Sequence, residues 1–482
     1  MDLVLKNGYV MTPRGAIDGG WVAIDGQRIA AIGGPRVEPP VAAEVVDLAG
    51  KPLLPGVIDP HTHPGNYGML RDELASVTRS AARGGVTTII GIVKSTRMGG
   101  EFKELVTAGD VGSYTDVFDE GRACIDRTAV VDVAFTFIIM NDLHAAEIPH
   151  YAEELGVTTF KFFPSSAAPT RWHASIGTPS TGDDGTIFLA LRNISRIGGL
   201  ASFHPENLQV ARVLEQDVRS AGRDDLDAWE RRSPGFLEAY DVRKMAFFAE
   251  QTGATIYPVH VNSKEGVAEI ARVKRQGIPM YAETCPRYLV LTKHYAARPP
   301  ALAKTAPPLR DHVDQEMLWE ALRNGTLDTV GSDHSPMSLA MKAADQGIWG
   351  AKAGFGDVGT LLPIMLSEGV NRGRITLERL TQICCENPAR VFGLYPRKGV
   401  IQVGADADLV AVDLAARRTV PAADPGGVVD FSPYAGMELQ GWPVLSVLRG
   451  RLLLRDGEVA GPPWARYLPR TVGARELASV EA

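Results

Sequence analysis

The chain has 482 residues, of which 45% are hydrophobic and 22% are charged, so it can bury a sizeable core and is not of the disordered class. This length predicts one large domain with a smaller one beside it. With 50 basic and 57 acidic side chains the formal net charge is −7, and no run of Lys or Arg could neutralise a phosphate backbone, so we expect no nucleic-acid partner.

The first residues, MDLVLKNGYV, lack the apolar stretch and the cleavage site of a signal peptide. The most apolar segment, 130–140, contains Asp132 and is far shorter than the ~20 residues that span a bilayer. The four cysteines have no zinc-finger spacing, and we expect free thiols. These features predict a cytoplasmic protein with no membrane partner.

Both ends of the chain have the texture of short β-strands. Residues 3–54 alternate apolar runs with turns, and Asp25-Gly26 predicts a hairpin because glycine accepts the positive φ of a tight turn. The same texture returns in GVIQVGADADLVAVD and in VLSVLRGRLLLRDGEV. We therefore predict that residues 1–54 and 397–460 together build one small β-sandwich domain.

Between the ends, apolar strand-like runs alternate with amphipathic stretches, which is typical of a parallel α/β fold. Eight strands are predicted: Gly56–Asp59, Val86–Ile92, Val130–Ile139, Thr158–Phe163, Gly199–His204, Ala254–Val261, Met280–Thr284 and Thr329–Asp333. Helices are predicted at Leu70–Gly84 and Ser233–Gly253, the second opening on Ser233-Pro234. The pattern predicts a (β/α)₈ TIM barrel over residues 55–396, followed by a tail, 461–482, with no obvious core of its own.

Side chains of metal-ligand type close five of the eight predicted strands. They are His61 and His63, Lys161, His204, His260 and Asp333. Each has an ordinary alternative, because a histidine can be a surface or core residue and a Ser-Asp pair can cap a helix. The joint pattern favours a metal site, because the active sites of such barrels lie at the carboxyl ends of the strands.

Lys161 lies between aromatic residues in the apolar segment GVTTFKFFP. Burial without a partner opposes the charged form of a lysine and lowers its pKa. A neutral amine can take up CO₂ to form a carbamate, which is anionic and has two oxygens that can bridge two cations. The alternative is a lysine whose amine reaches the solvent at the barrel mouth.

The sequence resembles the amidohydrolase superfamily, in its hydantoinase and dihydropyrimidinase branch. The resemblance runs through almost the whole chain, in the segments PGVIDPHTHPG, GVTTFKFF, ASFHPEN, YPVHVNSKEG, YAETCPRYLVLT, TAPPLR, VGSDHSP, ENPARVFGLYPRKGVIQVGADADLVAVD and SPYAGMELQGWPVLSVLRGRLLLRDGE. It implies a cyclic amidase that works by attack of a metal-bridging hydroxide. It also implies a tetramer in which the tail takes part.

The resemblance implies a role for each ligand. His61 and His63 bind one divalent ion, His204 and His260 bind the second, and Lys161, carboxylated by CO₂, bridges both. Asp333 binds the first ion and shuttles the proton to the leaving nitrogen. Zinc is the expected metal, with manganese or cobalt as alternatives.

The substrate-binding positions depart from the pattern of the family. A tyrosine is expected shortly after the bridging lysine, but the stretch that includes Phe163 and Ser166 offers none. Ala306 stands where a serine usually precedes Pro-Pro, and an asparagine of the loop after the last strand is replaced around Phe355. Fewer polar groups predict a more apolar small-molecule amide than hydantoin or dihydropyrimidine, such as an aryl-substituted cyclic amide or imide.

Two other functions remain open at the level of sequence. The altered pocket is compatible with a linear amide or carbamate hydrolase on the same scaffold. A non-catalytic assembly protein of the dihydropyrimidinase-like type is the other, although such relatives lose metal ligands and none is missing here.

Overall fold

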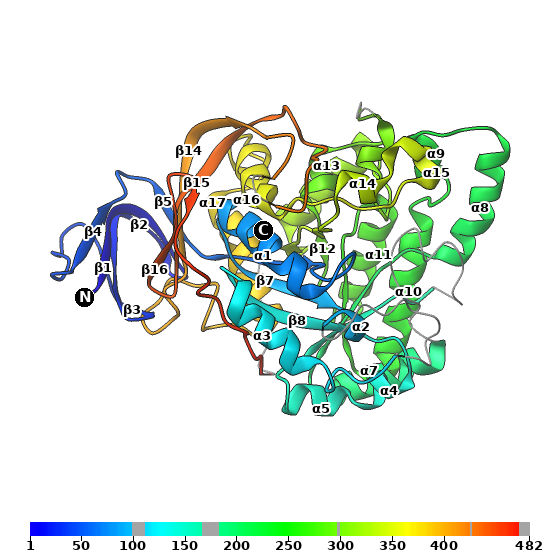
Figure 1. Cartoon of the computed structure of the whole chain (residues 1–482), viewed down its shortest axis with the longest axis horizontal. Coiled ribbons are helices and arrows are strands. Elements are labelled where there is room, and N and C mark those ends of the chain that lie inside the picture. The colour runs from blue at the N-terminus through cyan, green and yellow to red at the C-terminus, as the bar shows by residue number, and fades with distance from the viewer. Residues whose placement is uncertain (99–110, 166–182, 296–298, 425–426, 472–482) are drawn as a thin grey trace.

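A curled sheet of six parallel strands lies at the centre of the computed structural model, which describes residues 1–98, 111–165, 183–295, 299–424 and 427–471 (Figure 1). Its order is β11-β10-β9-β8-β7-β6, so strands that follow one another in the chain are neighbours. The bounds are β6 Val57–Thr62, β7 Val86–Val93, β8 Asp132–Ile138, β9 Thr159–Phe162, β10 Leu200–Phe203 and β11 Thr255–Pro258.

Two more strands, β12 (Glu283–Thr284) and β13 (Thr329–Val330), form a parallel pair. Backbone bridges join this pair to both edges of the curled sheet, at Ile256–Met280 on one side and Thr62–His334 on the other. On the second side the His63 amide donates to the His334 carbonyl over 2.9 Å. All eight predicted strands are therefore present, in the predicted order.

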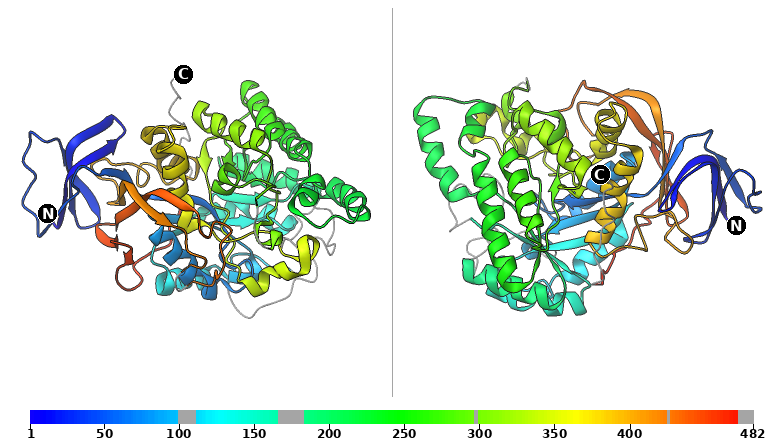
Figure 2. Two further views of the ribbon diagram at one scale, coloured as in Figure 1. Left: turned by 90° about the horizontal axis from the view of Figure 1, so that it is seen from above. Right: turned by 180° about the vertical axis from the view of Figure 1, so that it is seen from behind.

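Helices connect the strands and cover the outside of the curled sheet (Figures 1 and 2). The longer ones are α1 Leu70–Arg83, α3 Phe118–Thr128, α7 Asp184–Arg196, α8 Leu208–Ser220, α10 Phe236–Thr252, α11 Lys264–Arg275 and α13 His312–Asn324. The shorter ones are α2 Ser95–Met98, α4 Asp142–Ala146, α5 Ile148–Glu153, α9 Leu226–Arg231, α12 Pro286–Val290, α14 Leu339–Lys342, α15 Gly347–Gly350, α16 Leu361–Ile364, α17 Leu377–Thr381 and α18 Asn387–Val391. Short 3₁₀-helices lie at η2 Pro300–Ala303, η3 Ala344–Gln346 and η4 Val358–Thr360. Short π-helices lie at η5 Met365–Val370 and η6 Gln382–Glu386.

The two predicted helices are confirmed, with one difference. Helix α1 buries Leu70, Leu74 and Val77 at helical spacing against the sheet. Helix α10 ends at Gly253, whose φ of 72° is the left-handed form that favours glycine. It begins at Phe236 and not at Ser233-Pro234. Gly235 takes the N-cap position, with helical backbone angles and without a hydrogen bond from a capping side chain.

Both ends of the chain build one sheet of nine strands, which lies at the end of the molecule away from α8 and α10 (Figure 2). The strands are β1 Leu3–Thr12, β2 Gly15–Asp25, β3 Arg28–Gly33, β4 Glu44–Asp47, β5 Pro52–Pro55, β14 Leu409–Thr419, β15 Glu438–Leu448, β16 Arg451–Arg455 and β17 Glu458–Val459. Strand β5 pairs with β1 and with β14, which joins the two ends. The predicted hairpin is present, with Gly26 at a φ of 55°.

A cluster of buried charged side chains connects this sheet to Asp132, the first residue of β8. The amino group of Lys398 contacts the carboxylates of Asp132 at 2.9 Å and Asp406 at 3.3 Å, and it also contacts Asp408. Arg449 contacts Asp132 over 3.1 Å. The three carboxylates lie close enough together to hold a cation, but the ammonium of Lys398 already lies among them and Arg449 pairs with Asp132, so we interpret the cluster as structural.

The described part of the predicted tail packs against its own chain. Tyr467 bridges to Val133 of β8, and its hydroxyl donates to the Leu155 carbonyl over 2.8 Å. The guanidinium of Arg470 is buried and donates to Thr159 of β9 over 2.8 Å. Residues 465–470 therefore cover one end of the curled sheet, which the sequence did not indicate.

Membrane-spanning helices and disulfides are the two remaining features on which the sequence analysis made a prediction. Among the described residues, no helix has the length and apolar character needed to cross a membrane. The four cysteines are free and buried.

Candidate metal-binding active site

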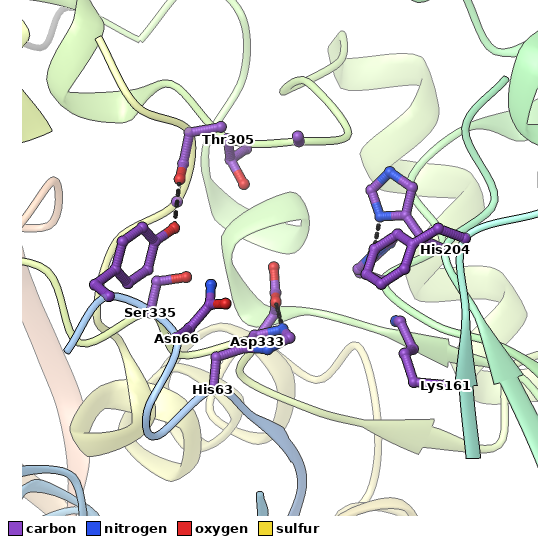
Figure 3. A pocket seen from close by; sticks show the side chains of 13 residues that line it. His63, Asn66, Lys161, His204, Thr305, Asp333 and Ser335 are labelled. Atoms are coloured by element: carbon purple, nitrogen blue, oxygen red, sulfur yellow. Dashed lines mark hydrogen bonds and ion pairs between the residues drawn. The ribbon is translucent and has the colours of Figure 1, made fainter. Parts of the chain in front are cut away.

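The six predicted ligands meet at one end of the curled sheet, where the strands end. His61 and Lys161 lie on β6 and β9, and His63 and His204 directly follow β6 and β10. His260 comes two residues after the end of β11, and Asp333 three residues after the end of β13. Figure 3 shows His63 and Asp333 together on one side of a pocket, with Lys161 and His204 opposite them. The convergence expected from the sequence is thus present in the structure.

His61, His63 and Asp333 form the first half of the site. The Nε2 atoms of the two histidines are 3.1 Å apart, and Asp333 Oδ1 lies 3.4 Å from His61 Nε2 and 3.0 Å from His63 Nε2. All three ligand atoms lie within 4.8 Å of one another and are buried. A single divalent ion could contact all of them.

His204, His260 and Lys161 form the second half. His204 Nδ1 faces His260 Nε2 over 2.8 Å. The Lys161 amino group is buried with no hydrogen-bond partner among the described residues, and it lies 5.6 Å from the centre of the Phe163 ring. A buried amine without a partner is costly, so this arrangement calls for a group that is not part of the protein chain.

Burial controls the protonation of the ligands. It lowers the pKa of His63 to about 4, and it holds the pKa values of His61 and His260 well below the usual range. Burial also lowers the pKa of Lys161 to about 8. The three histidines are therefore neutral near pH 7, which is the form that binds metals.

Two buried glutamates orient the histidines from behind, and the sequence analysis missed both. Glu283 Oε1 lies 2.6 Å from His61 Nδ1, and Glu206 Oε2 lies 2.9 Å from His204 Nε2. Each carboxylate binds the ring nitrogen that points away from the centre, so His61 Nε2 and His204 Nδ1 face inward. Glu206 could have been found two residues after His204, whereas nothing in the sequence links Glu283 to His61.

Arg287 of α12 is buried directly behind Asp333. Its guanidinium contacts Asp333 Oδ2 at 3.3 Å and Asp357 Oδ1 at 2.9 Å, and it donates to Thr305 Oγ1 over 3.0 Å. Burial alone would raise the pKa of Asp333, but its interactions with His61, with the Arg287 guanidinium and with His63 outweigh burial and hold that pKa well below its usual range. Asp333 is therefore an ionised carboxylate of fixed orientation.

Two of the ligands have unusual backbone angles. His260 has a φ of 42° and Asp333 a φ of 52°, a left-handed conformation that side chains with a Cβ rarely adopt. Such strain persists only where the surroundings enforce it, and it gathers at functional sites. It turns both side chains away from the strand direction toward the common centre.

The pocket above the ligands contains two of the four predicted substrate-binding residues. Phe163 and Ala306 line it, together with Thr305, Ala353 and Gly354. Phe355 lies behind the wall instead, because its ring packs 4.3 Å from the Arg287 guanidinium and is fully buried. Ser166 lies outside the described residues.

Besides Thr305, three polar side chains that the sequence analysis did not select also line the pocket. Asn66 and Tyr67 come from the loop after β6, and Ser335 follows Asp333 by two residues. Asn66 and Ser335 lie on the His63 side of the pocket (Figure 3). The only sequence signal for them is their nearness to a ligand, which does not reveal where a side chain points.

Comparisons with known proteins agree with this geometry. Residues 246–453 match the model of the amidohydrolase family. The chain is 33% identical to the L-hydantoinase of Paenarthrobacter aurescens, with 95% of each chain covered, and 34% identical to the D-hydantoinase of Geobacillus stearothermophilus, with 98% of this chain and 97% of the relative covered. The crystal structure of dihydropyrimidinase from Brevibacillus agri superposes with a TM-score of 0.87 at 30% identity, covering 99% of this chain and 100% of that one. The chain therefore belongs to the amidohydrolase family, in its hydantoinase branch.

Proposed function

We propose that this protein hydrolyses the C–N bond of a cyclic amide at a centre of two divalent metal ions. As a member of the hydantoinase branch it is a hydrolase of carbon–nitrogen bonds other than peptide bonds. The observation that carries the proposal is the meeting of His61, His63, Lys161, His204, His260 and Asp333 at one end of the curled sheet.

The residues present fit two metal ions. His61, His63 and Asp333 would hold the first, and His204 and His260 the second. Lys161, carboxylated by CO₂, would bridge them, which supplies the partner that its buried amino group lacks among the described residues. We propose zinc as the metal, with manganese or cobalt as alternatives, because imidazole and carboxylate ligands accept all three.

The protein supplies orientation and proton transfer. Two divalent ions in this site would provide hydroxide at neutral pH and polarise the carbonyl that it attacks. Asp333 lies beside both His61 and His63 and is ionised, so it can accept a proton in the pocket and deliver it to the leaving nitrogen. Arg287 holds the carboxylate of Asp333 in place.

The substrate is a small-molecule amide. Phe163 offers an aromatic wall next to Lys161, and Ala306 adds a small apolar surface. A linear amide or carbamate hydrolase on the same scaffold is the second candidate, and these two apolar residues are the observation that favours it. A non-catalytic assembly role receives no support from the complete ligand set.

We further propose the architecture that the branch implies. The eight strands β6 to β13 complete a TIM barrel over residues 55–396, supported by the bridges that join β12 and β13 to both edges. Residues 1–54 and 397–460 form a β-sandwich domain, supported by a separate core that combines Leu5 and Val22 with Leu409 and Val447. We also propose a cytoplasmic homotetramer in which residues 461–482 contribute contacts.

Metal loading and ring opening test the function together. Protein reconstituted with Zn²⁺, Mn²⁺ or Co²⁺ should bind about two ions per chain and open at least one hydantoin, imide or lactam ring. Lys161→Ala should lose activity at least about 100-fold and hold less metal, because its bridge is gone. Lys264→Ala, at an exposed lysine of α11, is the matched control and should change neither.

Two outcomes would contradict the proposal. Protein that binds no metal and does not respond to any of the three ions would favour the non-catalytic role. Release of a free amine from linear amides or carbamates, without opening of any ring, would favour the second candidate.

A further inference from the structure

One wall of the pocket is polar, although the positions compared in the sequence had suggested an apolar pocket. Asn66, Tyr67 and Ser335 all line it, next to His63 and Asp333. The Asn66 side chain makes no hydrogen bond to any described residue. An amide that can both donate and accept is therefore free to bind a ligand in the pocket.

The Tyr67 hydroxyl is placed by groups on the opposite side of the pocket mouth. It donates to the Ala353 carbonyl over 3.1 Å, and the Ser335 hydroxyl lies near it. Gly354 has a φ of 101°, and a Cβ there would come within 2.7 Å of Ser335 Oγ and 3.5 Å of the Tyr67 oxygen. The glycine thus leaves room for the two hydroxyls to lie together.

The loop that carries Asn66 and Tyr67 is held by one buried carboxylate. Glu73 of α1 accepts a hydrogen bond from the Gly65 amide over 2.6 Å and another from the Gly68 amide. The Asn66 backbone amide donates to the His63 carbonyl over 3.2 Å. These hydrogen bonds fix the loop at both ends, so both side chains are preorganised.

The facing segment is equally fixed. Lys342 of α14 is buried and donates to the carbonyls of Lys304 and Gly354, over 2.7 Å in each case. The Gly354 amide donates to the same Lys304 carbonyl over 3.0 Å. Ala353 therefore presents its carbonyl to Tyr67 from a rigid support, beside Thr305 and Ala306.

We propose that Asn66, Tyr67 and Ser335 form a specificity subsite that hydrogen-bonds the second carbonyl of a cyclic imide or ureide. This inference rests on the proposed function and narrows its substrate class. A lactam has only the carbonyl that is attacked, so it would leave the Asn66 side-chain amide, which has no hydrogen-bond partner among the described residues, unsatisfied in a partly desolvated pocket. The family pattern has a tyrosine near Phe163 and a serine at position 306, and both are absent here. The subsite provides polar groups of the same kind from other loops.

The test compares rings with one and with two carbonyls. In metal-loaded protein, Tyr67→Phe and Ser335→Ala should each lower kcat/KM for succinimide and hydantoin about 10- to 100-fold. The inhibition constant of 2-pyrrolidinone, which has one carbonyl, should change less than about twofold, because it does not reach the subsite. Tyr240→Phe, at a tyrosine of α10 that is 53% exposed, is the matched control and should leave every value unchanged.

The metal content and the melting temperature of each variant show whether a lower kcat/KM comes from weaker substrate binding or from loss of metal or of the folded structure. Equal losses for the one-carbonyl and two-carbonyl rings would show that Tyr67 and Ser335 only shape the pocket, and would overturn the subsite. So would a wild-type protein that binds 2-pyrrolidinone as tightly as succinimide. If metal-loaded wild-type protein opened no ring at all, the proposed function itself would fail.

Discussion

Lys304 is a buried lysine close to the pocket but outside the metal centre. Its amino group donates to the Ala351 carbonyl over 2.6 Å and lies 3.9 Å from the centre of the Trp229 ring. Burial, together with the nearby charge of Arg232, lowers its pKa to about 7. The folded protein therefore binds this proton less tightly than the unfolded chain does.

This difference predicts how stability depends on pH. Between pH 7 and the ordinary pKa of lysine, the unfolded chain holds more protons, so the contribution of Lys304 to the free energy of unfolding rises with pH. From pH 7 to pH 8.5 we expect a gain of up to about 2 kcal/mol that is absent in Lys304→Met. Denaturant unfolding of both proteins at the two pH values measures it, with Lys264→Met as the exposed control. An equal pH dependence in wild type and Lys304→Met would rule this role out.

At the scale of single residues, the meeting of the six candidate ligands could be predicted from the sequence, and the residues that support them could not. Each ligand stands at the end of an apolar run, and parallel strands bring their carboxyl ends together. Glu283 contacts His61, and Arg287 contacts Asp333. The partners in each pair lie far apart in the chain, so no sequence spacing indicates these contacts. Phe355 was selected because it stands in the loop after the last predicted strand, where the family pattern has an asparagine, but its ring packs on Arg287 and not on the pocket.

The loop of residues 64–68 depends on an element that follows it, helix α1. Glu73 in the first turn of α1 accepts hydrogen bonds from the loop, so the helix and the loop are ordered together. In Glu73→Gln a neutral amide replaces the carboxylate and cannot accept all of these bonds. The variant should lose about 1–3 kcal/mol of stability.

The same variant should also raise KM more than it lowers kcat, because the loop carries Asn66 and Tyr67. Hydrogen exchange at the amides of residues 65–68 should become faster. Asp72→Asn is the control, at a neighbouring acid whose side chain is 65% exposed. Unchanged exchange in these amides would show that Glu73 does not hold the loop.

At the scale of elements, the sequence was most informative where apolar runs are long. Strands β7 and β8 lie within a residue or two of their predicted bounds. Strand β12 has only two residues where Met280–Thr284 was predicted. Met280 forms only an isolated bridge to Ile256, so the ladder does not extend over the whole predicted strand. The start of α10 differed because Gly235 took the N-cap position that Ser233 was expected to fill.

Across the whole molecule, Lys398 joins the sheet built by the chain ends to β8. It is 1% exposed and faces three buried carboxylates, and its removal would leave Asp408 without an ion-pair partner among the described residues. Lys398→Met should lower the free energy of unfolding by about 3–5 kcal/mol. Arg417→Met breaks the Arg417–Glu438 pair, whose side chains are 61% and 60% exposed, and should cost at most about 1 kcal/mol.

Chemical denaturation measures both changes, and metal analysis provides an independent readout. We expect Lys398→Met to keep its metal content, because the cluster is structural. A loss below about 1 kcal/mol, or a loss of bound metal, would contradict this role.

The meeting of both chain ends was visible in the sequence, because the same β-like texture occurs at each end. The course of residues 465–470 along β8 was not visible. Burial of Tyr467 and Arg470 depends on the shape of the surface formed by β8 and β9, and their own segment has no periodicity.

The pairing of β5 with both β1 and β14 also determines the order in which the protein can be completed during synthesis. The first five strands leave the ribosome long before β14, and until then the edge of β5 that will bind β14 is unpaired. An unpaired edge can pair with another nascent chain, so the protein is most open to aggregation while residues 56–408 are still being translated. Slow translation or early termination upstream of residue 409 would prolong that state.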